Sequence, residues 1–184
     1  MINSALYDRI PATDVRKKMW EPAPTAANFP LPTTAFVRRA YMTRKFSVKA
    51  VGDPSLGDVP WMRSAEMYLI LAEAYARSGQ DNLARTTLLS LVSKRDLSAT
   101  LSTKSGADLI DEIMFNRRVE LWGEGFRYLD LKRLNLPLDR TAVPNYVATS
   151  VANVMQIPAG DPRFLFLIPR DEINSNPNIG PQNP

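Results

Sequence analysis

The sequence contains neither cysteine nor histidine among its 184 residues. Their absence excludes disulfides, thiol chemistry, the usual zinc sites and any catalytic triad that runs through an imidazole. Catalysis by carboxylates, lysine or tyrosine stays open. No apolar run approaches the roughly 20 residues that a membrane-spanning helix needs. The start of the chain also lacks the pattern of a signal peptide, which predicts either a cytosolic protein or a processed start upstream of this chain.

Positive charge is concentrated near the N-terminus, although the net charge is only +4. Residues 9–49 carry nine Lys or Arg against Asp14 and Glu21, whereas residues 50–184 carry fourteen against sixteen acids. A basic arm of this kind can bind nucleic acid. The aromatic residues within it follow no stacking or groove-reading motif, so we expect no nucleic-acid partner.

A second pattern of charge lies between residues 110 and 134, where six charged residues follow one another at spacings of three or four. These are the distances between neighbours on a helix face, and the apolar residues around them predict that much of the charge lies near the interior. We expect a structural ion-pair network, because a buried charge without a partner costs several kcal/mol. The six residues are Arg117, Glu120, Glu124, Arg127, Asp130 and Arg133.

Glu120 and Glu124 permit two interpretations. The first is that Arg117 and Arg127 neutralise them within the network. The second is that two carboxylates one turn apart act as the acid and base of a glycosidase. Glycine is costly inside a helix, so Gly123 and Gly125 predict a break, with Phe126 opening a second short helix. Residues 106–136 are therefore expected to form a charged helix pair that begins near Ser105 or Asp108.

An antiparallel helical hairpin is expected over residues 61–95. Ser64 can cap a helix that reaches residue 78, Gly79 can end it, and Asp81 can cap a second helix that reaches residue 94. The small Ala72 and Ala84 would allow close approach of the two helices, while Tyr68 and Tyr75 fill the groove. The tetratricopeptide signature is matched at Tyr68, Leu71, Ala72, Tyr75, Ala84, Leu88 and Leu91. One such pair cannot bury both faces, so either residues 106–134 or repeats absent from this chain form the next layer.

The remaining segments are rich in proline, which interrupts long helices. Residues 1–60 are expected to be irregular, with one short helix at 14–20 capped by Thr13 or Asp14 and an extended stretch at 37–51. Residues 137–184 are expected to form an irregular tail with one short strand at 164–168 and an extended end. The sequence thus predicts an all-α fold with long irregular loops. No cofactor is expected; Asp53 and Asp58 could bind calcium, but a plain turn is the favoured interpretation.

Four stretches, in the same order, resemble the C-terminal part of the SusD/RagB family, the outer-membrane lipoproteins that capture glycans in Bacteroidetes-type bacteria. They are IPATDVRKKM from residue 10; Arg63, Glu66, Tyr68, Leu69 and the Ala72 to Ala74 run; Arg117 to Leu121 followed by Glu124, Gly125, Arg127 and 130–133; and Ile168, Pro169, Glu172, Asn176, Pro177 and 182–184. Asn116 stands where the family usually has Glu, which would remove one ion pair. The sequence stops at Pro184, where a Gly and an aromatic residue often follow.

This resemblance implies that residues 1–184 are the C-terminal portion of a non-catalytic, surface-exposed lipoprotein of the cell outer membrane. It implies binding of an oligosaccharide and cooperation with a SusC-like TonB-dependent transporter in nutrient uptake. The N-terminal portion of the same protein, with its lipid-bearing cysteine, would lie outside this chain. The charged network would then be structural.

Sugar rings bind to aromatic faces, and their hydroxyls bind to amides and carboxylates, usually on loops. The aromatic candidates on loops are Trp20, Tyr41, Trp61 and Tyr146, with Asn28 and Asn145 as hydrogen-bonding partners. For each aromatic residue, packing in the core or against the absent portion is the alternative. Two other functions stay open for the protein, a tetratricopeptide-like adaptor that binds a peptide and the carboxylate glycosidase.

Overall fold

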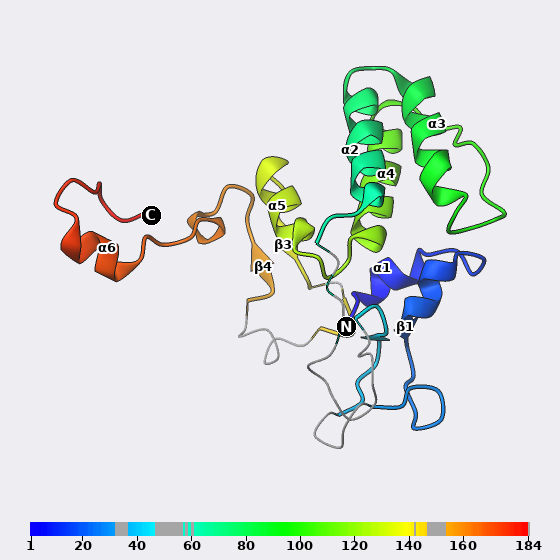
Figure 1. Ribbon diagram of the computed structural model, residues 1–184, viewed down its shortest axis with the longest axis horizontal. Helices are drawn as coiled ribbons and strands as arrows, with labels where there is room; N and C mark the ends of the chain where they lie inside the picture. The colour runs from blue at the N-terminus through cyan, green and yellow to red at the C-terminus, as the bar shows by residue number, and fades with distance from the viewer. Residues whose placement is uncertain are drawn as a thin grey trace. The chain divides into compact units, whose positions relative to one another are not determined.

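The computed structural model describes residues 1–31, 37–46, 57, 59, 61–141, 143–146 and 154–183 (Figure 1). Over these residues the regular structure is mostly helical, with strands of only two residues each, and the predicted all-α class is confirmed. The chain divides into two compact units, Met1–Phe126 and Arg127–Pro184. No helix in the described ranges is long and apolar enough to cross a membrane.

The predicted hairpin is formed by α2 (Ser64–Arg77) and α3 (Asp81–Val92). Gly79 takes a φ of +76° in the turn between them, a value that glycine adopts without a Cβ clash. The predicted caps are wrong, because the N-cap residues are Arg63 and Gln80 and neither gives a side-chain cap bond. Asp81 is instead the first residue of α3, and its carboxylate accepts a hydrogen bond from the Gly106 backbone N–H at 3.0 Å.

Helix α4 (Gly106–Glu120) forms the next layer on this hairpin, and it contacts both α2 and α3 (Figure 1). Ala72 and Ala84 are fully buried, so the two helices of the hairpin approach closely as predicted. Leu109 and Ile113 of α4 complete this core. Tyr75 packs against the core, but Tyr68 is 44% exposed and does not fill a groove between the described helices.

A second core packs around Val119 at the end of α4 and joins the N-terminal segment to it. Its members are Ile2, Leu6, Ile10, Trp20 and Val119. Helix α1 (Ser4–Asp8) and a 3-10 helix (Val15–Met19) bring these residues together. The Asp14 carboxylate caps the 3-10 helix, as predicted. Strands β1 (Trp20–Glu21) and β2 (Met42–Thr43) then pair antiparallel, with Trp20 opposite Thr43. The rest of the stretch expected to be extended has no strand where it is described.

Helix α4 ends at Glu120, and α5 (Phe126–Arg133) begins at Phe126, so the predicted break is confirmed. Gly123 and Gly125 take φ values of +79° and +88° between the two helices. These angles lie in the left-handed region, where a side chain is strained. The glycines therefore end one helix and let the chain turn into the next.

The second unit contains β3 (Leu138–Asp139), which pairs with β4 (Gln156–Ile157), a 3-10 helix (Pro162–Phe164) and α6 (Arg170–Ser175). The strand predicted at 164–168 is wrong, because Phe164 ends the 3-10 helix that the Asp161 carboxylate caps, and residues 165–168 form no strand. The prediction of an extended end is also wrong over α6. Pro169 stands just before that helix, and Asp171 and Glu172 complement the dipole of its first turn.

Candidate functional site

Glu120, the last residue of α4, lies at the centre of a buried charged network. It is 3% exposed, and its carboxylate accepts hydrogen bonds from three arginines. Arg95 donates from Nε and Nη2 at 3.0 and 2.9 Å. Arg63 donates from Nη1 at 2.9 Å, and the Arg16 guanidinium lies 3.4 Å away. Three segments far apart in the sequence therefore meet on one carboxylate.

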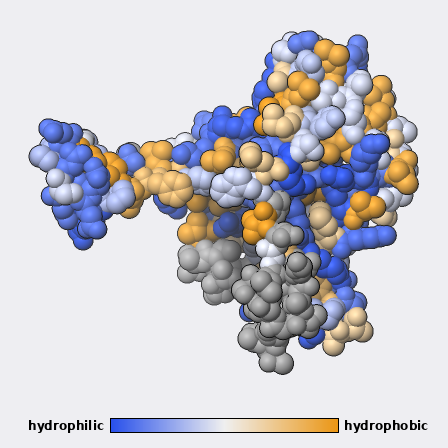
Figure 2. Space-filling view, in the orientation of Figure 1, coloured by the Kyte–Doolittle hydropathy of each residue, from blue (hydrophilic) through white to orange (hydrophobic). Residues whose placement is uncertain are grey.

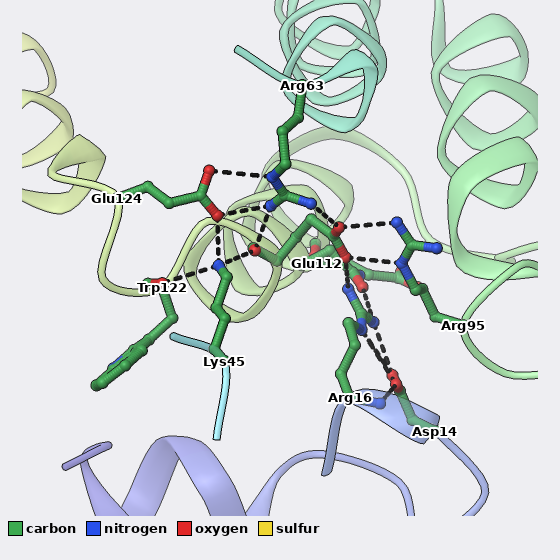
Figure 3. A network of polar contacts seen from close by, with 10 residues as sticks. Asp14, Arg16, Lys45, Arg63, Arg95, Glu112, Trp122 and Glu124 are labelled. Carbon is green, nitrogen blue, oxygen red and sulfur yellow. Dashed lines mark hydrogen bonds and ion pairs between the residues drawn. The ribbon is translucent and has the colours of Figure 1, made fainter. Parts of the chain in front are cut away.

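Glu124 extends the network into the turn between α4 and α5. Arg63 donates to both of its carboxylate oxygens, at 3.1 and 2.7 Å, and Lys45 forms a further ion pair with it (Figure 3). The Lys45 ammonium also donates to the backbone carbonyls of Glu120 and Trp122, each at 2.8 Å. Lys45 thus satisfies the carbonyl of the last residue of α4 and one carbonyl in the turn that follows it.

Arg16 connects this network to the N-terminal segment. Its guanidinium is 4% exposed and pairs with Asp14 at 2.7 Å. Arg16 also donates to the side-chain oxygen of Asn116 at 2.8 Å, while the Asn116 amide donates to the Glu112 carbonyl at 3.0 Å. The resemblance predicts that Asn116, in place of the usual Glu, removes an ion pair. In the structure the amide oxygen of Asn116 accepts a hydrogen bond from Arg16 at this position.

The partners predicted for Glu120 and Glu124 are wrong. Arg117 is buried, but its guanidinium lies over the Phe126 ring, 5.2 Å from the centroid. Glu124 is instead paired with Lys45 and Arg63, and Arg127 is the first residue of the second unit. The spacing rule describes neighbours on one continuous helix, whereas Glu124 lies beyond the end of α4. In α5, Arg133 does pair with the buried Asp130 at 2.8 Å.

The electrostatics of Glu120 do not suit the glycosidase interpretation. Burial alone would raise its pKa, but the hydrogen bonds from Arg95 and Arg63 outweigh burial and lower the pKa to about 2. A general acid of a glycosidase needs a raised pKa, so that it holds a proton at neutral pH. The guanidinium groups of Arg95 and Arg63 therefore hold Glu120 in its charged form at neutral pH.

An open hollow of about 580 Å³ lies on the same unit, beside α1, the 3-10 helix and the β1–β2 pair. Its lining combines two aromatic side chains with charged groups of both signs. The lining residues are Tyr7, Ala12, Lys17, Lys18, Trp20, Glu21, Pro22 and Arg44. A concave surface with converging polar groups is the usual form of a small-molecule site.

Tyr7 is the partly exposed aromatic residue of this hollow. The Lys17 ammonium lies 4.8 Å from its ring centroid and donates to the Ile10 carbonyl at 2.6 Å. Tyr41 meets the Tyr7 ring edge-on, with 5.4 Å between the centroids. Desolvation and the nearby Glu21 carboxylate raise the pKa of the Tyr7 phenol, which therefore keeps its proton and can donate a hydrogen bond.

The predicted aromatic candidates lie in different places. Trp20 lines the hollow but is 2% exposed, so little of its ring is open to a sugar, and its burial supports the core alternative. Tyr41 is not a lining residue of the hollow, but its ring contacts that of Tyr7, which is one. Trp61 precedes α2 and is 85% exposed. Tyr146 belongs to the second unit, where the Arg140 guanidinium lies 5.5 Å from its ring.

The polar candidates are also separated. Asn28 is occupied within its own turn, where it accepts from the Thr25 N–H at 2.7 Å and donates to the Ala23 carbonyl. Asn145 belongs to the second unit. Asp53 and Asp58 lie outside the described residues. In the parts of the chain that the structure describes, no group of three or more acidic side chains could hold a metal ion.

Sequence reasoning missed Tyr7, Lys17, Lys18, Glu21 and Arg44 as a group. The excess of basic residues between positions 9 and 49 was the available signal. This excess does not locate the group, because no local spacing shows that residues 7, 17 and 44 share one hollow.

Comparisons with known proteins agree with this fold. The sequence profile of the SusD family matches residues 13–184. A crystal structure of a SusD superfamily protein from Bacteroides thetaiotaomicron VPI-5482 is 31% identical, with a TM-score of 0.75, and the match covers 98% of this chain and 39% of that chain. A crystal structure of a SusD-like carbohydrate binding protein from Bacteroides vulgatus ATCC 8482 is 28% identical, with a TM-score of 0.73, and the match covers 96% and 40%.

No match was found among the curated proteins. The chain spans about two fifths of the length of these two solved relatives. The family profile extends over nearly the whole chain, and the fold agrees with the solved structures at 31% and 28% identity. The chain therefore belongs to the SusD family.

Proposed function

We propose that this chain is part of a non-catalytic, cell-surface protein that binds oligosaccharides at the outer membrane and delivers them to a SusC-like TonB-dependent transporter. Membership of the SusD family is the observation that carries the proposal. One solved relative is described as a carbohydrate binding protein. The hollow beside α1 supplies a concave polar surface on this chain where a sugar could bind.

In this proposal the hollow binds sugar hydroxyls through the charged groups on its wall. Glu21 offers carboxylate oxygens as acceptors, and Lys18 and Arg44 offer donors. The exposed ring of Trp61 is a second surface for stacking on a sugar face, outside the hollow. The Tyr41 ring packs edge-on against Tyr7 of the lining, and the buried Trp20 ring packs edge-on against Trp122.

We propose that the protein is not catalytic because its two candidate carboxylates are both held in ion pairs. Glu120 and Glu124 are engaged by Arg16, Arg63, Arg95 and Lys45. Inverting and retaining glycosidases both need one acid that holds a proton and a second that faces the sugar. We therefore expect bound oligosaccharides to be recovered intact.

Isothermal titration against a broad panel of oligosaccharides tests the proposal, with chromatography of the recovered ligands as a test for cleavage. We expect binding of at least one oligosaccharide and no hydrolysis. Trp61→Ala is a useful variant, because an 85% exposed side chain contributes little to stability. No binding across the panel, or release of shorter sugars, would overturn the proposal. Co-purification with a SusC-like transporter tests the partnership separately.

A tetratricopeptide-like adaptor is the second candidate. The observation behind it is the outer face of α2, where Met67, Ile70 and Leu71 are exposed. Such an apolar face could bind a helix or a peptide. A peptide that binds to this face and is released by Ile70→Lys would favour the adaptor over glycan capture.

A further inference from the structure

The charges that line the hollow beside α1 are unbalanced. Three cationic side chains, Lys17, Lys18 and Arg44, line it with only one carboxylate, Glu21. Lys17 is held by the Ile10 carbonyl and the Tyr7 ring. The hollow therefore carries a net charge of +2 from its own lining, within the most basic part of the sequence.

Two of the cations retain unused donors. Lys18 is exposed, and among the described residues it has no hydrogen-bonding or ion-pair partner. Arg44 uses only Nη2, which lies 3.4 Å from the Glu21 carboxylate and also donates to the Asn28 carbonyl. Its Nε and Nη1 groups make no hydrogen bond to the described residues. The Arg44 guanidinium is held in place by the Phe29 ring, 4.6 Å from the centroid.

A fixed guanidinium with free donors and a nearby free ammonium match a negatively charged group better than a hydroxyl. Charge-assisted hydrogen bonds to carboxylate or sulfate oxygens are about twice as strong as neutral ones. Neutral hydroxyl groups would leave both positive charges without a counter-charge. Single-stranded nucleic acid is disfavoured, because Lys17 and Tyr41 already contact the Tyr7 ring on which a base would stack.

We propose, on the basis of the proposed function, that this hollow binds acidic oligosaccharides, whose carboxylate or sulfate groups are held by Lys18 and Arg44. The two anionic groups share the same chemistry toward these side chains. Glu21 then has a selective role, since it holds Arg44 on one side and repels an anion from its own edge of the hollow. Lys18 is the residue expected to determine specificity.

The test is calorimetric titration of the protein with three ligands of equal length at low and high salt. The ligands are trigalacturonate, its fully methyl-esterified form and a sulfated galactose trisaccharide. We expect at least one anionic ligand to bind about tenfold or more tightly than the methyl ester, and increasing salt to weaken only the anionic binding. Trigalacturonate and the sulfated sugar distinguish carboxylate from sulfate as the preferred group.

Lys18→Gln is the informative variant, and Lys94→Gln is its matched control, because Lys94 is exposed, lies just beyond α3 and does not line the hollow. We expect Lys18→Gln to weaken anionic binding about three- to tenfold without changing the Tm, a range set by solvent screening of an exposed charge. Lys94→Gln should leave the affinity for the anionic ligands unchanged.

Two results would overturn this inference and leave glycan capture intact. The first is that neither trigalacturonate nor the sulfated trisaccharide binds more tightly than the methyl ester. The second is anionic binding that Lys18→Gln does not weaken, or that Lys94→Gln weakens equally. A poly-dT oligonucleotide that binds more tightly than every sugar would also overturn it. Failure of all sugars, neutral and anionic, would remove the proposed function and this inference together.

Discussion

At the scale of single residues, Glu120 determines how the first unit is held together. Its carboxylate accepts bonds from Arg63 and Arg95 and lies beside Arg16, so one acidic group neutralises positive charge from three segments. A buried ion pair is weak evidence for net stability, because desolvation offsets much of the Coulomb attraction. The loss of one partner is different, since the remaining charges stay buried and unpaired.

We therefore expect Glu120→Gln to lower the free energy of unfolding by about 3–5 kcal/mol. Asp111→Asn is the matched control, because Asp111 is exposed on the same helix and should change stability by less than about 0.5 kcal/mol. Urea denaturation followed by tryptophan fluorescence measures both. Equal stability of the two variants would show that the network contributes little.

The same residue predicts a pH dependence. The pKa of Glu120 is about 2 in the folded protein and 4.5 in the unfolded reference, so the folded state binds fewer protons between these values. Its contribution to stability is complete above about pH 4.5 and is lost as the pH falls toward 2. The loss is about 3 kcal/mol, at about 1.4 kcal/mol for each pH unit.

Urea denaturation at pH 5.5 and pH 2.5 tests this expectation. The free energy of unfolding of the Glu120→Gln variant should fall less between the two pH values than that of the unsubstituted protein. The comparison isolates Glu120, because the other carboxylates titrate in both proteins. Parallel pH profiles would contradict the predicted pKa.

At the scale of elements, two glycines shape the turn from α4 into α5. Gly123 and Gly125 both have positive φ, but their surroundings differ. A Cβ on Gly123 would lie 2.5 Å from Cε2 of Phe46, whose ring stacks on Trp122. A Cβ on Gly125 would meet nothing within 4 Å. Substitution of Gly125 therefore tests backbone strain alone, whereas substitution of Gly123 adds steric overlap.

We expect Gly125→Ala to destabilise the protein by about 1–2 kcal/mol, the cost of a left-handed backbone for an L-residue. Gly123→Ala should cost about 1–3 kcal/mol more, because the Phe46 ring must also move. Thermal unfolding compares the two variants directly. A smaller loss for Gly123→Ala than for Gly125→Ala would show that the Phe46 ring moves away at no cost.

At the scale of the whole molecule, α2 has more apolar surface than the described residues cover. One face, with Leu69 and Ala72, packs in the core, while Met67, Ile70 and Leu71 on the other side are 63%, 44% and 44% exposed. Figure 2 shows apolar residues at the surface over the α2–α3 hairpin. A helix that is apolar on all sides is normally buried. We propose that a further part of the same protein, corresponding to the remaining length of its relatives, packs on this face.

The rate at which hydrogen peroxide oxidises methionine measures whether this face of α2 is covered. Met67 should oxidise readily in the 184-residue chain, because its side chain is 63% exposed, and slowly in a longer form of the protein in which the face is covered. Met114, which is 8% exposed, is the internal control and should be protected in both. Equal oxidation of Met67 in the two forms would contradict a partner on this face.

The sequence by itself determined the helical hairpin, the helix over residues 106–120 and the break at the two glycines. These features depend on neighbours three or four residues apart and on the backbone freedom of glycine, which local patterns report directly. The order of four motifs also identified the family. The tail is predicted less well, because asparagines that alternate with prolines after residue 169 indicate an extended segment, whereas residues 170–175 form α6.

Only the tertiary structure decided the partners of Glu120, which lie 104, 57 and 25 residues away at Arg16, Arg63 and Arg95. It also decided that Trp20 belongs to the core and that Lys18 and Arg44 share one hollow with Tyr7. The physical reason is that such contacts form where separate segments pack against α4. No periodicity along the chain records which distant residue will meet a buried charge.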